Sequence, residues 1–277
     1  SPLSLRGKVV AITRPEAQAH EIARTVSKLG GKPYIAPTLM IKQLKHEPQI
    51  KELINKATMG QVDFAIFLSR NSVKAVVEAS EKMRLKAEFV KALNRMEIVA
   101  IGPKTKEELQ RNCVEVSIVP SYYTSKGIVE SLRQMNLRGR TVAIPRASKA
   151  DMYLRKELSQ MGADVMEIPM YEYAIPSDES KILKLFHSLF NEEIDIITFT
   201  SSKTFENLFQ LAKTHALDER LRDSLNRRVV VAVIGPSTQR TLEKHGVKAD
   251  VVPKEYTVEA MVDALLRYLD KGHALKT

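Results

Sequence analysis

The chain has 277 residues, enough for two domains that each bury a core of their own. Its 44% apolar and 27% charged residues are ordinary for a soluble globular protein, and no apolar run approaches the length that spans a membrane. A net charge of +10 favours an anionic partner, while Cys113, the single cysteine, excludes an internal disulfide and a cysteine-based metal site.

The first half of the chain alternates buried-type strands with amphipathic helices. An apolar strand at Val9–Ile12 precedes a helix at about Ala17–Leu29. An extended stretch with prolines follows over residues 33–44, and a helix then leads to a strand at Phe64–Phe67. Two more strands are expected in this half, at Val99–Ala100 and Val116–Val119.

The second half repeats the first in altered form. Leu5-Arg6-Gly7-Lys8 returns as Leu137-Arg138-Gly139-Arg140, an offset of 132 residues (137 − 5). Ile101–Thr105 returns as Ile234–Thr238 at an offset of 133 (234 − 101), so only one residue slips across the repeat. The chain therefore holds two versions of one α/β unit.

Further elements of the second half follow the same order. A helix is expected at about Asp151–Met161, an extended stretch over residues 165–176 and a short strand at Asp250–Val252. Strands that alternate with helices of this length predict parallel sheets covered by helices on both faces. The fold class is α/β with two similar domains, and a site between two such domains is the first place to look for function.

Polar turns follow the strands where ligands bind in open parallel sheets, at the carboxyl ends. These turns are rich in small hydroxyl residues and open helices whose N-termini suit carboxylates or phosphates. The candidates are Ser69, Ser72, Lys104, Thr105, Thr124, Ser201, Ser202, Ser237, Thr238 and Thr257. Plain helix capping explains the same residue types, so both interpretations stay open.

Other kinds of active site have weaker support. Neither Gly-Pro loop has the glycine spacing of a dinucleotide or Walker motif. No nucleophile–base pair stands out, so an enzyme of this sequence is expected to hold and orient a reactive substrate. Tyr171 stands where the first half has Leu39; this phenol is either a structural core residue or a proton donor.

The positive charge has three explanations. The basic residues are spread over helix faces, and no zinc finger, helix-turn-helix or RNA-binding motif accompanies them, which disfavours nucleic acid. A polyanionic small molecule fits the charge, and so does a set of solvated lysine-rich helices. The six histidines have no ligand spacing, so no metal is expected, and Ser1–Arg6 lacks a signal-peptide core, which favours the cytoplasm.

Seven segments, in order along nearly the whole chain, resemble the uroporphyrinogen-III synthase family. They are Ile12–Pro15, Phe67–Ser72, Ile101–Thr105, Tyr123–Ile128, Met170–Tyr173, Phe199–Ser202 and Ile234–Thr238. The resemblance implies a cofactor-independent enzyme of tetrapyrrole biosynthesis. It would cyclise the linear tetrapyrrole hydroxymethylbilane, a small-molecule polycarboxylate, to uroporphyrinogen III with loss of water and inversion of ring D.

The resemblance also implies roles for individual residues. Tyr171 matches the family tyrosine that assists departure of the hydroxyl group. Thr105 and Thr238 match the threonines of the two Gly-Pro loops that face the cleft between the domains. Hydroxyl residues beside that cleft are matched by Ser69, Ser201 and Ser202, and weaker contacts by Arg14, Ser72, Lys149 and Thr257.

The family architecture implies a domain division other than a cut at the middle of the chain. Residues 1–36 and 175–277 would form one domain and residues 40–171 the other, with a two-stranded connector at about 33–44 and 165–176. The protein would be a cytoplasmic monomer that binds neither nucleic acid nor membrane. The alternative is a non-catalytic two-domain binding module for an anionic metabolite.

Overall fold

A computed structural model describes residues 3–44, 47–148 and 151–272, and it divides the chain into two compact units. Unit 1 combines the residues up to Met40 with those from Ala174 onward, and unit 2 runs from Ile41 to Tyr173. Both crossings between the units therefore fall inside the stretches expected to connect two domains. Each unit has its own sheet and its own buried clusters.

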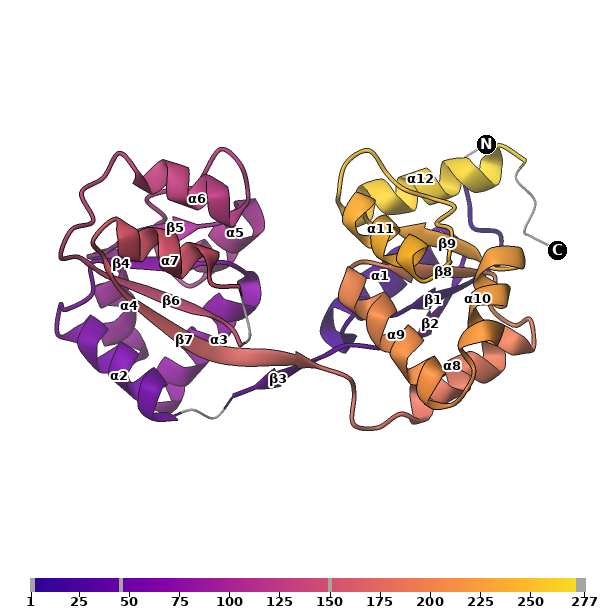
Figure 1. The fold of residues 1–277 in the computed structure, drawn as a ribbon, viewed down its shortest axis with the longest axis horizontal. Helices are drawn as coiled ribbons and strands as arrows, with labels where there is room; N and C mark the ends of the chain where they lie inside the picture. The colour runs from indigo at the N-terminus through magenta and orange to yellow at the C-terminus, as the bar shows by residue number, and fades with distance from the viewer. Residues whose placement is uncertain (1–2, 45–46, 149–150, 273–277) are drawn as a thin grey trace. The chain divides into compact units, whose positions relative to one another are not determined.

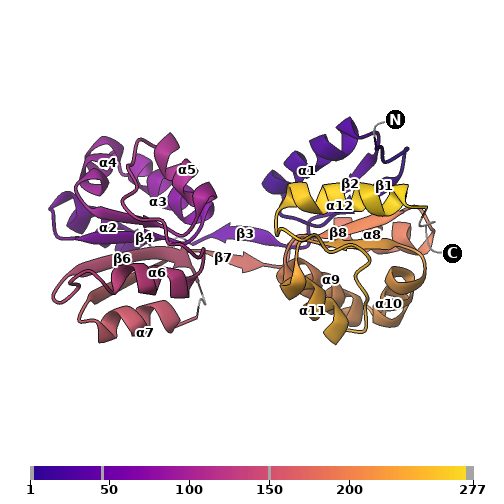
Figure 2. The same cartoon turned by 90° about the horizontal axis from the view of Figure 1, so that it is seen from above.

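The sheet of unit 1 has four parallel strands with helices on both faces (Figures 1 and 2). In spatial order the strands are β2 (Lys32–Ile35), β1 (Val9–Ile12), β8 (Ile196–Phe199) and β9 (Val230–Val233). One face packs on α1 (Glu16–Lys28) and α12 (Val258–Asp270). The other face packs on α8 (Ser180–Phe190), α9 (Ser202–Thr214), α10 (Asp218–Arg227) and α11 (Pro236–Lys244).

Unit 2 has the same three layers around a five-stranded sheet (Figure 2). In spatial order the strands are β3 (Met40–Gln43), β7 (Asp164–Ala174), β6 (Thr141–Ala147), β4 (Phe64–Phe67) and β5 (Glu97–Ala100). One face packs on α2 (Glu47–Thr58), α3 (Arg70–Lys82), α4 (Lys86–Asn94) and α5 (Pro103–Arg111). The other packs on α6 (Ser125–Leu132) and α7 (Tyr153–Gln160).

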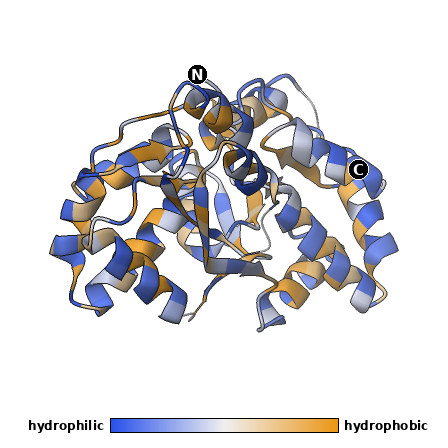
Figure 3. Ribbon diagram, turned by 60° about the vertical axis from the view of Figure 1, so that its left-hand side comes forward, coloured by the Kyte–Doolittle hydropathy of each residue, from blue (hydrophilic) through white to orange (hydrophobic). Residues whose placement is uncertain are grey.

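The residue pattern explains these layers. Neighbouring residues of β8 enter different cores, Ile196 with α1 and α12 and Ile197 with the helices of the opposite face. Successive side chains of a strand point to opposite faces, so a strand covered on both sides is apolar throughout. The helices are amphipathic: each combines hydrophilic and hydrophobic residues along its length, as Figure 3 shows. The predicted fold class is confirmed.

Two expected short strands are wrong. Val116–Val119 and Asp250–Val252 form only single bridges to the sheets, at Ile118 and Val251. In each segment a side chain takes the place of a backbone acceptor. Ser117 Oγ accepts a hydrogen bond from Ile98 N at 3.1 Å, and Asp250 Oδ2 accepts one from Val231 N at 2.8 Å. The regular ladder therefore does not extend along these segments.

Helix ends agree closely with expectation. α1 begins and ends one residue earlier than predicted, and α7 is shorter than the predicted Asp151–Met161. Within the described ranges, no helix is both long and apolar enough to cross a membrane.

Candidate functional site

Tyr171 and Ser69, two of the predicted site residues, meet at the carboxyl end of the unit 2 sheet. Ser69 follows β4 and caps α3, because its Oγ accepts a hydrogen bond from Ser72 N at 3.1 Å. The phenol oxygen of Tyr171 lies 2.8 Å from the same Oγ, and either hydroxyl can donate. The helix cap thus holds the hydroxyl of Tyr171 in place.

A register shift explains why Tyr171 points inward. Along β6 and β7, Arg146 lies opposite Pro169, but Ala147 lies opposite Tyr171, so Met170 is an extra residue on β7. The shift breaks the alternation of faces, and Met170 and Tyr171 are both only 2% exposed. A β-bulge of this kind changes the direction in which a side chain at the end of a strand points.

Burial makes the phenol of Tyr171 less acidic. It raises the pKa of Tyr171 well above the usual range of tyrosine, while the hydrogen bond with Ser69 opposes the rise. The ring of Tyr173 packs edge-on against Tyr171, with the ring centres 5.6 Å apart, and the polar Tyr173 side chain raises the pKa of Tyr171 further. Tyr171 therefore carries its proton at neutral pH and can serve as a donor.

Unit 1 has the same cap without the phenol. Ser201 caps α9 by accepting a hydrogen bond from Thr204 N at 3.2 Å, as Ser69 caps α3. Leu39, at the repeat position of Tyr171, is buried and offers no proton. Chemistry that needs this phenol is therefore restricted to unit 2.

Each unit also has a Gly-Pro helix start that lacks a side-chain cap. Gly102 and Gly235 are the N-cap residues of α5 and α11, each followed by proline. Thr105 and Thr238, in the first turns, are 4% and 3% exposed. Within the described part of the chain, neither threonine hydroxyl has a hydrogen-bond partner. Uncapped N–H groups and these hydroxyls offer donors to an anion.

A tyrosine ring lies against each of these glycines. A Cβ placed on Gly102 would lie 3.3 Å from Tyr123 Cγ, and one on Gly235 would lie 3.1 Å from Tyr256 Cδ1. Tyr123 and Tyr256 are nevertheless 60% and 66% exposed, so much of each ring faces solvent. Neither ring was predicted as part of the site, although each precedes a predicted threonine at the repeat offset.

Those two threonines, Thr124 and Thr257, cap the next helices. The side chain of Thr124 accepts a hydrogen bond from Gly127 N at 3.0 Å in α6, and that of Thr257 accepts one from Ala260 N at 3.1 Å in α12. Their hydroxyl oxygens thus fix the turns that carry the tyrosine rings.

Gly127→Ala should displace the turn that carries Tyr123 and Thr124. A Cβ at Gly127 would collide with the Tyr122 carbonyl oxygen and lie 3.0 Å from its carbonyl carbon. We expect a loss of about 1–3 kcal/mol in the free energy of unfolding, measured by chemical denaturation. The control is Ala260→Gly at the repeat position, which creates no collision and should cost about 1 kcal/mol or less. Equal losses in the two variants would contradict the steric explanation.

Other predicted residues serve the helix starts or the packing between helices. Ser72 is fully buried, and its Oγ donates to the Ser69 carbonyl at 2.7 Å within the first turn of α3. Ser202 Oγ donates to the Ser237 carbonyl at 3.4 Å, which links the first turns of α9 and α11.

Three basic residues were also predicted to contact the ligand. Arg14 is half-buried at the end of β1, and its Nε donates to Gln18 Oε1 at 3.2 Å. Lys104 is exposed in the first turn of α5. Lys149 lies outside the described residues.

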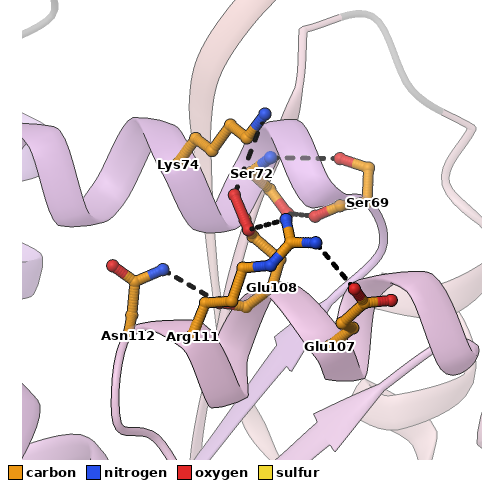
Figure 4. Close-up of polar contacts among 7 residues, drawn as sticks. All are labelled: Ser69, Ser72, Lys74, Glu107, Glu108, Arg111 and Asn112. Carbon is orange, nitrogen blue, oxygen red and sulfur yellow. Dashed lines mark hydrogen bonds and ion pairs between the residues drawn. The ribbon is translucent and has the colours of Figure 1, made fainter. Parts of the chain in front are cut away.

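A buried carboxylate joins α3 to α5 in unit 2, as Figure 4 shows. Glu108 Oε1 lies 3.8 Å from Lys74 Nζ, and its Oε2 accepts a hydrogen bond from Arg111 Nη1 at 3.4 Å. The side chain of Glu108 is 7% exposed, so these two cations offset the cost of burying its charge. The contacts hold the Gly-Pro start of α5 beside the helix capped by Ser69.

Arg146, at the end of β6, was not predicted as a site residue. It occupies the repeat position of Arg14 (146 − 14 = 132), so the internal repeat offered a signal. Its side chain is 9% exposed, which the sequence pattern did not indicate.

No group of three or more His, Cys, Asp or Glu residues in the described part of the chain could hold a metal ion.

Comparison with known proteins assigns the chain to a family. The family model for uroporphyrinogen-III synthase HemD matches residues 20–263. The chain belongs to the uroporphyrinogen-III synthase family. The Tyr171–Ser69 pair and the two Gly-Pro helix starts all lie within the matched region.

Individual relatives cover nearly the whole chain. A Methanothermobacter thermautotrophicus protein that carries the family name provisionally is 35% identical over 257 residues, 92% of this chain and 96% of its own. The uroporphyrinogen-III synthase of Synechococcus elongatus is 28% identical over 266 residues, 94% and 95% of the two chains. The fold matches a mutant uroporphyrinogen III synthase of Thermus thermophilus with a TM-score of 0.66 at 23% identity, over 96% and 100% of the chains.

Proposed function

We propose that this protein is a uroporphyrinogen-III synthase, a cyclising hydro-lyase that converts hydroxymethylbilane to uroporphyrinogen III. Family membership over residues 20–263 is the observation that carries the proposal. The names of the relatives support the same activity. The buried phenol and the uncapped helix starts supply groups that suit this chemistry.

The reaction begins with loss of a hydroxyl group. Tyr171 donates its phenolic proton to the hydroxyl oxygen of the substrate, the C–O bond breaks, and water leaves with the electron pair of that bond. An electron pair of the adjacent pyrrole forms the new double bond, and loss of the pyrrole N–H proton gives a neutral azafulvene. The azafulvene methylene carbon then bonds to the substituted α-carbon of ring D and gives a spirocyclic intermediate. The older bond from that α-carbon to the methylene of ring C breaks and re-forms at the free α-carbon of ring D. That carbon loses its proton, the azafulvene nitrogen regains one, and all four pyrroles are aromatic with ring D inverted.

The substrate carries an acetate and a propionate on each ring, so it presents many carboxylates. Uncapped helix starts at Gly102 and Gly235 offer N–H groups and the positive ends of helix dipoles. The hydroxyls of Thr105 and Thr238, two residues that are otherwise buried, add one donor each. We propose that these groups bind substrate carboxylates and hold the chain of rings in the conformation that closes.

An assay with hydroxymethylbilane tests the proposal. Purified protein should yield the type III isomer, separated from type I by chromatography after oxidation to the porphyrins. Formation of the spontaneous type I isomer alone would refute the enzymatic activity. Binding of the linear tetrapyrrole without conversion would instead support the alternative, a binding module for an anionic metabolite.

Thr105→Val should raise KM for hydroxymethylbilane about 2- to 10-fold with little change in kcat. The variant removes one neutral hydrogen-bond donor, worth about 0.5–1.5 kcal/mol, but keeps the backbone N–H groups and the side-chain shape. Thr238→Val should behave alike. The control is Thr214→Val at the last turn of α9, where the hydroxyl donates to Gln210 O within the helix. An unchanged KM in both loop variants would remove the two hydroxyls from substrate binding.

We further propose that the enzyme works as a cytoplasmic monomer without a cofactor, and binds neither nucleic acid nor membrane. The net charge of +10 supports a polycarboxylate as its partner.

A further inference from the structure

Tyr123 and Tyr256 are exposed aromatic rings that hold equivalent places in the two units. The internal repeat relates them at an offset of 133 residues (256 − 123). Tyr123 is 60% exposed and Tyr256 is 66% exposed. One exposed aromatic side chain is normal on a protein surface. The same exposed ring at the same place in both units indicates a shared role, which its surroundings identify.

Each ring lies where a helix start would otherwise carry a side chain. Gly102, the N-cap residue of α5, has an extended backbone (φ −163°, ψ −179°), and so has Gly235 at α11 (φ −174°, ψ −176°). Residues with side chains also adopt an extended backbone, so the backbone does not require glycine here. The rings supply the reason, because an added Cβ would lie 3.3 Å from Tyr123 Cγ or 3.1 Å from Tyr256 Cδ1, closer than ordinary van der Waals contact.

Donors for an anion lie beside each ring. No side chain caps α5 or α11, so the first N–H groups of both helices remain for a ligand. Thr105 and Thr238, in the first turns, are 4% and 3% exposed, and neither hydroxyl has a hydrogen-bond partner among the described residues. An unpaired hydroxyl on an otherwise buried residue indicates a partner that binds from outside. A ligand at either start therefore meets hydrogen-bond donors and an aromatic surface next to each other.

The turns that carry the rings are held by hydrogen bonds. Thr124 N donates to the Tyr122 carbonyl at 2.8 Å, and the Thr124 side chain caps α6. In unit 1 the side chain of Thr257 caps α12 in the same way. A tyrosine has few rotatable bonds, so a ring on a fixed turn loses little freedom when a ligand covers it. Both rings are thus preorganised contact surfaces.

The donors and the ring together favour an aromatic ligand that carries carboxylates. Small-molecule sites combine aromatic surfaces with a few polar groups that fix the orientation of the ligand. Flat rings pack against tyrosine in offset or edge-on arrangements. In the pyrroles of the proposed substrate, one or two methylene carbons separate each carboxylate from its ring. A carboxylate bound at a Gly-Pro helix start therefore brings its pyrrole against the neighbouring tyrosine.

We propose that Tyr123 and Tyr256 each pack against a substrate pyrrole whose carboxylate is bound at the adjacent Gly-Pro helix start. This inference rests on the proposed function and deepens it, because it assigns the apolar part of substrate recognition. The helix starts alone would accept any carboxylate, whereas the tyrosines favour one that is attached to an aromatic ring. Both residues hold rings of the substrate and transfer no proton.

Binding of uroporphyrinogen III, measured without oxygen by isothermal titration calorimetry, tests the inference. Tyr123→Leu and Tyr256→Leu remove the aromatic surface and should each raise Kd about 3- to 10-fold. Tyr123→Phe and Tyr256→Phe keep the ring and should leave Kd within about 2-fold. Because all these side chains are exposed, the substitutions should not unfold the protein.

The matched control is Tyr122→Leu, which should leave Kd within about 2-fold. Tyr122 is 66% exposed and lies in the same turn, but the ring against Gly102 is that of Tyr123. An equal rise in Kd for Tyr122→Leu would indicate a general effect of this surface and would overturn the proposal. Equal losses in the phenylalanine and leucine variants would assign the effect to the hydroxyl groups and would overturn it too.

The binding measurement does not depend on turnover, so it separates this inference from the proposed function. An unchanged Kd in both leucine variants, or no binding to the unmodified protein, would refute the contact between tyrosine and pyrrole, whatever the assay with hydroxymethylbilane shows. Formation of the type I isomer alone, with the expected rise in Kd present, would refute only the enzymatic activity.

Discussion

Tyr171→Phe is expected to lower kcat for hydroxymethylbilane about 100-fold while leaving the fold intact. A positioned proton donor typically contributes about 10²- to 10⁴-fold, and the low end applies because this hydroxyl also departs without an enzyme. The ring that fills the core remains, and Ser69 can still cap α3 through its contact with Ser72 N. Steady-state turnover and far-ultraviolet circular dichroism together measure the effect.

The neighbouring ring provides the control for that variant. Tyr173 is 43% exposed and contacts Tyr171 edge-on. Tyr173→Phe keeps this ring contact and should leave turnover within about 2-fold, since it removes no proton that the proposed mechanism uses. Unchanged turnover in Tyr171→Phe would exclude Tyr171 as the acid. Equal losses in both variants would point to packing as the cause.

Phe205→Ala should lower the free energy of unfolding by about 3–5 kcal/mol, the usual cost of deleting a buried aromatic ring. Phe205 is fully buried in the first turns of α9. Its ring packs edge-on against Phe199, with the ring centres 5.3 Å apart, and stacks on the ring of Phe209, with the ring centres 5.6 Å apart. Chemical denaturation measures the loss.

Hydrogen exchange should locate that loss in unit 1. The cluster that contains Phe205 is formed entirely by residues of this unit, so protection should fall in β8 and α9 but not in β4 and α3. Leu183→Ala on α8, where the side chain is 37% exposed, is the control and should cost less than about 1 kcal/mol. Equal loss of protection in both units would contradict this location.

The layered fold was predictable because it depends on local pattern. Continuous apolar strands and amphipathic helices alternate along the chain, and the internal repeat doubles each signal. The two false strands, Val116–Val119 and Asp250–Val252, have the right residue types but pair at one residue each. Whether a backbone acceptor or a side chain meets an edge N–H group depends on three-dimensional placement, which residue pattern does not specify.

The candidate site was only partly predictable. Ser69 and Tyr171 were expected separately, but their hydrogen bond depends on the extra residue Met170 in β7, and a register shift leaves no clear mark in a single sequence. Ser72 was expected to contact a ligand because serine at a helix start suits both roles; the hydrogen bond that its Oγ donates to the Ser69 carbonyl depends on the local turn, which the residue type does not specify. Arg146 was missed because a charged residue at a strand end normally predicts exposure.

Ser117 and Asp250, the side chains that bond N–H groups at the sheet edges, affect the tendency of the protein to aggregate. An open strand with free N–H groups can recruit a strand of another molecule and start aggregation. On β5 the N–H of Ile98 is already bonded to Ser117, and on β9 that of Val231 is bonded to Asp250. A strand of another molecule would have to displace these hydrogen bonds before it could pair with β5 or β9. These two sheet edges therefore resist aggregation by strand addition.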